Sequence, residues 1–293
     1  MSKIEYFDKS GNSRGYYSTT NRVNDLTGKE WLFWTRSVIT KVYPPNLQHN
    51  LRRRHGGQKP PDLCADLIKV FTKKGERVLD PYMGVGGTLL GAAIAGRKAL
   101  GIEINSKWIN IYRDVCRLEG LNEFKTISGD CKIILRDMLK DKGREGEYDM
   151  VLTDVPYWNM DRVERSMGTY KKVGEEGHEV KRTKLSVFND EEGGTFKSKD
   201  DWLNRVKEVI DFSSGLLKRN KYILIFIGDM YYKGRYHCLS AELADKISEI
   251  EGLVWKANIV WYDVSKKLHL YGYQYSYIPS MIHQNILVFR KEK

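Results

Sequence analysis

The sequence predicts an α/β protein built around a mostly parallel β-sheet. The first observation is a β-loop-α-β unit in residues 78–105: an apolar strand ends at Asp80, a glycine loop follows, and a second strand ends at Glu103. The second is that short apolar runs alternate with amphipathic stretches along the rest of the chain. The third is a pair of strand patterns at 253–262 and 284–290, which predicts a terminal antiparallel hairpin.

Periodicity places the elements between these landmarks. Apolar residues recur at helical spacing in six segments, one of them within the 78–105 unit, and short apolar runs mark the strands. We expect helices at 63–71, 89–95, 108–118, 132–139, 202–217 and 239–250, and strands at 78–80, 99–104, 124–127, 148–152 and 222–227. Because parallel strands place their ligands at their carboxyl ends, the acid-bearing loops after these strands are expected to converge on one site.

Composition limits the class of protein. With 293 residues and 41% hydrophobic content, the chain can bury a substantial core in one large domain. A formal charge of +11 favours a polyanionic partner, although a solvated basic surface gives the same count. The four cysteines show no metal-binding spacing, so we expect reduced thiols and no metal site. No apolar run reaches membrane length and no signal peptide begins the chain, so we expect a cytoplasmic protein that does not enter membranes.

Two segments stand apart from this pattern. Residues 1–24 are polar and lack periodicity, which predicts a flexible N-terminal arm before a single domain over 25–293. Residues 159–200 are polar and of mixed charge, and they are too long for a simple connection. This insertion is either a mobile substrate loop or a disordered segment.

The glycine loop has the chemistry of a nucleotide site. Glycines at 84, 86 and 87 let the backbone turn sharply and admit a ligand close to the main chain. Glu103, at the tip of the next strand, is placed to accept both hydroxyls of a ribose. The alternative is a tight turn in an ordinary α/β protein. A nicotinamide dehydrogenase is disfavoured, because the third glycine of the dinucleotide fingerprint would fall at Leu89.

Asp130 follows the strand at 124–127. Its carboxylate could accept the exocyclic amine of a bound adenine ring while the backbone N–H of Cys131 donates to a ring nitrogen. It could also cap the helix that follows, and the two roles are compatible.

A basic cluster, Arg52-Arg53-Arg54, lies shortly before the glycine loop. Such a run is either a solvated face or a set of contacts to the phosphates of a nucleic acid backbone. We treat the three arginines as candidate substrate-binding residues.

Five segments occur in an order that points to one family. They are His55-x-x-Gln58-Lys59-Pro60, Asp80-Pro81-Tyr82-x-Gly84-x-Gly86, Glu103, Asp130 and Asp154-Val155-Pro156-Tyr157. They resemble, in turn, the H-P-T-Q-K-P segment, the D-P-F-x-G-x-G loop, the ribose acid, the adenine-ring acid and the catalytic D-P-P-Y of the S-adenosylmethionine-dependent amino methyltransferases of nucleic acids. The resemblance is to the DNA adenine N6 and cytosine N4 enzymes in particular.

This resemblance implies a Rossmann-like class I methyltransferase fold with a seven-stranded, mostly parallel sheet and a terminal antiparallel hairpin. It also implies S-adenosylmethionine as cofactor and methyl transfer to the exocyclic amine of a flipped base in DNA. Adenine N6 is favoured over cytosine N4 because an aspartate leads the tetrapeptide. The implied cofactor-binding residues are Lys59, Asp80, Pro81, Tyr82, Gly84, Gly86, Glu103, Asp130 and Cys131.

The tetrapeptide Asp154-Val155-Pro156-Tyr157 is the implied catalytic segment. The Asp154 carboxylate and the Val155 carbonyl can accept the two N–H groups of the target amine and so orient its lone pair toward the methyl group. Tyr157 and Trp158 can stack on a base turned out of the duplex. The chain departs from the family at Val155, where a proline is usual, but valine keeps the carbonyl.

Three alternatives remain open from the sequence. An RNA base methyltransferase would share the same catalytic residues. A non-catalytic nucleic-acid-binding protein with a decayed cofactor site would account for Val155 and for Gly87, which stands where the family usually has serine or threonine. A dehydrogenase fits least. A cognate restriction endonuclease is a candidate partner, and the sequence leaves the oligomeric state undecided.

Overall fold

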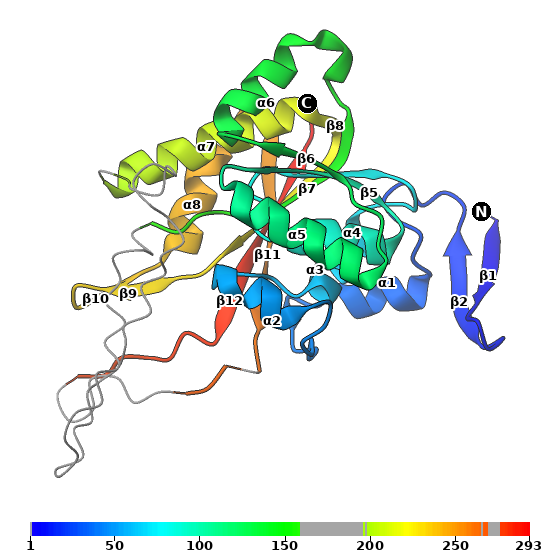
Figure 1. The fold of residues 1–293 in the computed structure, drawn as a ribbon. Coiled ribbons are helices and arrows are strands. Elements are labelled where there is room, and N and C mark those ends of the chain that lie inside the picture. Colours follow the sequence, from blue (N-terminus) through cyan, green and yellow to red (C-terminus); the bar gives the residue numbers. More distant parts are fainter. Residues whose placement is uncertain (1, 159–195, 197, 265, 269–275) are drawn as a thin grey trace.

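The computed structural model describes residues 2–158, 196, 198–264, 266–268 and 276–293, and Figure 1 shows its fold. Almost all of the insertion predicted at 159–200 lies outside the described residues. Within the described part of the chain, no helix has the length and apolar character needed to cross a membrane.

Helices and strands alternate along most of the chain. The helices are α1 (Gly28–Trp34), α2 (His49–Arg52), α3 (Pro61–Phe71), α4 (Gly87–Ala95), α5 (Ser106–Glu119), α6 (Cys131–Lys140), α7 (Lys199–Leu216) and α8 (Leu239–Ser248), with short 3-10 turns η1 (Arg53–His55) and η2 (Lys142–Arg144). The strands are β1 (Lys3–Phe7), β2 (Ser13–Ser18), β3 (Val38–Ile39), β4 (Arg77–Asp80), β5 (Lys98–Glu103), β6 (Lys125–Ser128), β7 (Tyr148–Asp154), β8 (Leu217–Ile227), β9 (Met230–Tyr232), β10 (Arg235–His237), β11 (Leu253–Tyr262) and β12 (His283–Lys291).

The main sheet has the order β3-β11-β12-β8-β7-β4-β5-β6. Strands β4 to β8 pair in parallel, whereas β12 is antiparallel to both β8 and β11. The predicted mostly parallel sheet with a terminal antiparallel hairpin is therefore confirmed. The two-residue strand β3 pairs with β11 and extends the seven strands to eight.

Strand β8 shows how the sheet separates two hydrophobic cores. Because successive side chains of a strand point to opposite faces, Ile223, Ile225 and Ile227 join the core that α6, α7 and α8 cover. Leu224 and Phe226 join the core beneath α3 and part of α4. Burial on both faces explains why this strand reads as a continuous apolar run.

A third core fixes the glycine loop after β4. Met83 and Val85 of that loop pack with Trp108, Tyr112 and Val115 of α5, and all five side chains are buried. The loop is thus a packed part of the fold, and its backbone is held close to the end of β5.

Residues 1–24, expected from the sequence to be a flexible arm, contain two strands. Strands β1 and β2 form an antiparallel hairpin, and the rings of Tyr6 and Tyr17 stack with centroids 5.1 Å apart. This hairpin lies beside the main body (Figure 1). Most of its side chains are exposed, so it carries no clean alternation of apolar and polar residues that could have predicted its strands.

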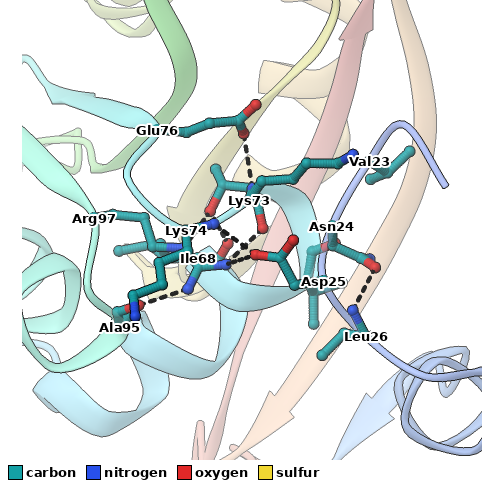
Figure 2. Close-up of polar contacts among 12 residues, drawn as sticks. Val23, Asn24, Asp25, Leu26, Ile68, Lys73, Lys74, Glu76, Ala95 and Arg97 are labelled. Carbon is teal, nitrogen blue, oxygen red and sulfur yellow. Dashed lines mark hydrogen bonds and ion pairs between the residues drawn. The ribbon is translucent and has the colours of Figure 1, made fainter. Parts of the chain in front are cut away.

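Residues that follow this hairpin in the chain make polar contacts with the main domain, and Figure 2 shows those of Asp25. The buried side chain of Asn24 donates to the carbonyl of Val70 at 2.6 Å. The Asp25 carboxylate accepts from the backbone N–H of Lys74 at 2.6 Å and lies 3.5 Å from the guanidinium of the buried Arg97. The boundary between arm and domain expected near residue 24 is therefore a site of close contact.

Candidate active site

A pocket opens where the parallel strands β4 to β7 end. Asp80 ends β4, Glu103 ends β5, Asp130 follows β6 and Asp154 ends β7; the last three line the pocket, and Asp80 does not. The pocket is lined by His55, Gly57, Pro81, Tyr82, Gly84, Ile102, Glu103, Ile104, Gly129, Asp130, Cys131, Asp154, Val155, Pro156, Phe196 and Arg205.

The glycine loop needs glycine for steric reasons. Gly86 has a φ of +79°, and a Cβ atom there would lie 2.3 Å from Cδ2 of the buried Tyr112. Gly87 is also confined, because a Cβ atom would lie 3.0 Å from the carbonyl oxygen of Lys59. Gly87, where the resembled family usually has serine or threonine, therefore lies at a point where the Lys59 backbone comes close to the loop.

Glu103 connects two loops at the pocket. One carboxylate oxygen accepts from the backbone N–H of Gly84 at 2.9 Å, and the other accepts from that of Asn105 at 2.9 Å. These bonds fix the orientation of the carboxylate at the pocket wall.

Asp80 is buried beneath the loop and does not line the pocket. Its Oδ1 accepts from the Thr153 hydroxyl at 2.7 Å and from the backbone N–H of Tyr82 at 3.1 Å. Burial raises the pKa of Asp80 to about 6, and the bonds from Thr153 and Tyr82 only partly oppose this shift. In the structure, Asp80 thus joins the ends of β4 and β7.

Asp154 is held at both carboxylate oxygens. The Tyr157 hydroxyl donates to Oδ1 at 3.2 Å, and the ammonium of Lys59 forms an ion pair with Oδ2. The Gln284 amide donates to the Tyr157 oxygen at 2.9 Å, which extends the network to β12. Burial raises the pKa of Asp154, and the charge of Lys59 is the largest opposing influence. The side chain remains 23% exposed at the pocket.

The loop after Asp154 is fixed by a residue that sequence reasoning assigned only to a helix core. Trp202 of α7 is fully buried, and its Nε1 donates to the carbonyl of Pro156 at 2.6 Å. Val155 is buried beside it, with 2% of its surface exposed. The strand-to-loop conformation that two prolines would stiffen is stabilised here by a hydrogen bond from another element.

Asp130 performs the helix-capping role that the sequence left open. Its Oδ1 accepts from the backbone N–H of Lys132 at 2.8 Å. Arg205 of α7, which the sequence did not single out, lies 2.5 and 2.6 Å from its two carboxylate oxygens. Burial alone would raise the pKa of Asp130, but the hydrogen bond and charge of Arg205 outweigh it and lower that pKa.

His55 closes the other end of the pocket. Its ring lies edge-on to Trp108, with centroids 5.1 Å apart, and it approaches the glycine loop at Gly84. Burial, assisted by the charge of Lys59, lowers the pKa of His55 to about 4, so the ring is neutral at pH 7.

The basic cluster divides between the interior and the surface. Arg52 is only 1% exposed, and its guanidinium donates to the carbonyls of Asn46 and Leu47 at 2.9 and 2.8 Å. Its charge is therefore used within the fold, and we remove Arg52 from the candidate phosphate contacts. Arg53 and Arg54, in η1, are exposed.

Trp158 lies outside the pocket lining. Its ring contacts Tyr232 of β9 and His237 of β10 edge-on, with centroid distances of 5.7 and 5.3 Å. The residue that follows Tyr157 is thus joined to a separate hairpin.

The pocket suits a ligand that contains a ribose and a flat ring. Two carboxylates, Glu103 and Asp130, stand at neighbouring strand ends, and Ile102, Ile104 and Phe196 supply apolar walls. Gly84, beside His55, and Gly86, beside Tyr112, carry no Cβ atoms, so the loop backbone stays uncovered there.

Fold and site together define an α/β domain with a pocket at the carboxyl ends of its parallel strands. The chain matches the model of the N6_N4_Mtase family, described as DNA methylase, over residues 3–114 and 148–293. The chain therefore belongs to this DNA methylase family. Membership of this family points to S-adenosylmethionine as the cofactor.

Individual relatives match over shorter stretches. The type II methyltransferase M2.DpnII of Streptococcus pneumoniae is 33% identical over 117 residues, which are 40% of each protein. A tRNA (guanine(10)-N2)-dimethyltransferase of Methanothermobacter thermautotrophicus is 29% identical over 102 residues, 34% of this chain and 28% of that enzyme. The matches thus span less than half of these curated relatives. The crystal structure of TrmN from Thermus thermophilus aligns with a TM-score of 0.47 and 14% identity, covering 82% of this chain and 53% of that one.

Proposed function

We propose that this protein transfers a methyl group from S-adenosylmethionine to the exocyclic amine of a base in DNA, with adenine N6 as the first choice. The observation that carries the proposal is the Asp154 carboxylate, which stands at the pocket with both oxygens oriented by Lys59 and Tyr157. The membership of a DNA methylase family supports DNA as the substrate.

S-adenosylmethionine, when bound, supplies an electrophilic methyl group on a sulfonium. Glu103 would hold its ribose hydroxyls, and Asp130 with the backbone N–H of Cys131 would hold its adenine ring. Because Gly84 and Gly86 lack side chains, the glycine loop would let the ligand approach the main chain closely. Asp80 would act mainly by supporting this loop through the Tyr82 N–H.

Asp154 and the carbonyl of Val155 would accept the two N–H groups of the target amine. An exocyclic amine is conjugated with its ring and is a poor nucleophile. Acceptors held in place before the reaction stabilise the positive charge that develops on nitrogen, without the cost of reorganisation. The ion pair with Lys59 favours the ionised form of Asp154, and Tyr157 offers an aromatic face to a base turned out of the duplex.

The test is incubation of the protein with labelled S-adenosylmethionine and unmethylated genomic DNA, followed by mass spectrometry of the nucleosides. N6-methyladenine supports the proposal in full, and N4-methylcytosine would change only the base.

RNA is the second candidate substrate, because one of the relatives is a tRNA methyltransferase. Transfer RNA offered in parallel tests this alternative. Methylation of RNA with DNA inert would replace the proposal. A protein that binds cofactor but methylates neither substrate would favour a non-catalytic or partner-dependent role, for which a cognate restriction endonuclease is one candidate.

A further inference from the structure

A short hairpin projects from the end of the sheet that carries the pocket. Strands β9 and β10 are joined by the two-residue turn Lys233-Gly234, whose φ angles are +48° and +76°. Two positive φ angles are typical of a type I′ turn, which makes a tight, stiff hairpin. Residues 233–236 are exposed, and in Figure 1 the hairpin extends away from the central sheet.

One face of this hairpin is turned toward the catalytic segment. Cross-strand partners lie on the same face, and the pairs are Tyr232 with Arg235 and Met230 with His237. Trp158 packs against Tyr232 and His237 of this face. We call the four residues Met230, Tyr232, Arg235 and His237 the inner face of the hairpin.

Cations lie beside the aromatic rings at this face: Arg235 belongs to the face, Lys233 to the turn and Lys199 to α7. Lys233 Nζ lies 5.4 Å from the centroid of Tyr232, and Lys199 Nζ lies 5.8 Å from that of Trp158. Arg235 stands directly across from Tyr232, and residues 230–237 contain no acidic side chain. Rings that stack on bases, combined with cations that neutralise phosphates, form the usual surface for an unpaired nucleic acid strand.

The base of the hairpin is fixed relative to the pocket. Asp229 accepts from the Tyr236 hydroxyl at 2.8 Å and from the backbone N–H of Ser240 at 2.9 Å. The adjacent Gly228 is close enough to Tyr157 that a Cβ atom would lie 3.3 Å from its ring. A surface held in this way loses little freedom when a partner binds.

We propose that the inner face and the turn of the β9–β10 hairpin bind DNA beside the target nucleotide, with Arg235 of the inner face and Lys233 of the turn contacting phosphates. Trp158 follows Tyr157 in the sequence and packs on the hairpin, so it links the DNA contact to the catalytic segment. The inference rests on the proposed function, because it takes DNA as the substrate and names the element that holds it.

The test compares the full chain with the double variant Lys233→Ala/Arg235→Ala. Binding of a fluorescent DNA duplex is measured by anisotropy over a series of salt concentrations, and cofactor affinity by calorimetry. Loss of charge-assisted contacts should weaken DNA binding roughly tenfold or more. The slope of log affinity against log salt should fall by about 2, since each phosphate contact contributes about 0.9. Cofactor affinity should not change.

A matched control removes two exposed lysines elsewhere. Lys98 and Lys125 begin β5 and β6, at the ends of the strands opposite the pocket. Lys98→Ala/Lys125→Ala changes the net charge equally but should leave most of the affinity and slope intact. The variant Arg235→Lys keeps the charge and should retain most of the binding, which separates loss of contact from misfolding.

The outcomes distinguish this inference from the proposed function. If the double variant binds DNA with unchanged affinity and slope while the full chain methylates DNA, the hairpin inference is overturned and the function stands. If the double variant loses DNA binding but the full chain methylates no DNA, the hairpin inference stands and the function fails. A loss seen with RNA but not with DNA would overturn the choice of DNA.

Discussion

Nη2 of Arg205 lies 2.5 and 2.6 Å from the two carboxylate oxygens of Asp130, across 75 residues of sequence. The contact joins α7 to the loop after β6 and stabilises the ionised form of Asp130. If Asp130 holds the adenine ring of the cofactor, Arg205 positions it.

We therefore expect Arg205→Ala to weaken cofactor binding roughly tenfold, since a charge-assisted hydrogen bond contributes about 1.5 to 3 kcal/mol. Titration calorimetry with S-adenosylmethionine measures this change, and Arg205→Lys should recover part of it. Unchanged or tighter binding in the alanine variant would show instead that Arg205 competes with the cofactor for Asp130.

Asp154→Asn should nearly abolish methyl transfer while cofactor affinity stays within a few-fold. Removing one preorganised group that stabilises developing charge costs about 10²- to 10³-fold in kcat. Single-turnover rates with saturating DNA and cofactor measure the effect. The control is Asp211→Asn, the same change at an exposed position of α7. Full activity in Asp154→Asn would remove the proposed role of this carboxylate.

Lys59→Gln should move the acid limb of the pH–rate profile to higher pH. Burial raises the pKa of Asp154, and the charge of Lys59 opposes this, with a smaller contribution from Lys266. Without Lys59 the pKa of Asp154 rises further, so the carboxylate is protonated at a higher pH and the rate falls sooner on acidification. Lys59→Arg, which keeps the charge, should restore most of the original profile. A profile that does not move would separate Lys59 from the ionisation of Asp154.

Asp80→Asn should stabilise the fold at pH 7. The folded-state pKa of Asp80, about 6, exceeds its ordinary value of 3.8, so folding favours the protonated form. Stability from this group is complete below pH 4 and is lost as pH rises through 6, by up to about 3 kcal/mol for a shift of roughly two units. Urea unfolding of both proteins from pH 4.5 to 7.5 measures the difference, which should grow with pH. A difference that does not change with pH would contradict the raised pKa of Asp80.

The same variant should bind the cofactor more weakly, because changes that raise stability at a functional site commonly reduce function.

Trp202→Phe should lower kcat without weakening cofactor binding. The variant keeps an apolar ring in the core but loses the part-buried hydrogen bond to the Pro156 carbonyl, at a cost of about 0.5 to 1.5 kcal/mol. Trp31→Phe, at a 40% exposed position of α1, provides the control for the substitution itself. Unfolding midpoints and turnover rates measured together check the expectation. A stability loss with normal turnover would limit Trp202 to a structural role.

The sequence predicted the elements whose burial leaves a pattern. Apolar runs such as Ile223–Ile227 and the glycine loop carry local signals for buried strands and for a turn. The acids at strand ends followed from the same reasoning, because parallel strands present their carboxyl ends together.

Other parts of the site had no local signal. Three side chains bind partners far away in sequence: Arg205 binds Asp130 across 75 residues, Trp202 binds Pro156 across 46 and Gln284 binds Tyr157 across 127. Each fits the ordinary apolar and polar pattern of its helix or strand, so nothing in that pattern marks the contact. Arg52 was predicted to contact phosphates because it belongs to a basic cluster, and this local signal was wrong. Its neighbours in the cluster are exposed, and only the fold shows that backbone carbonyls satisfy its buried guanidinium.

The position of β12 between β8 and β11 has a consequence for synthesis on the ribosome. Both neighbours emerge before residues 283–291, so each presents an unpaired, hydrogen-bonding edge until β12 arrives and fills the gap. The central sheet therefore closes late, through pairings distant in sequence, and such steps are slow. During that interval the nascent chain exposes strand edges that can aggregate, and a chain that stopped before residue 283 would leave the sheet open.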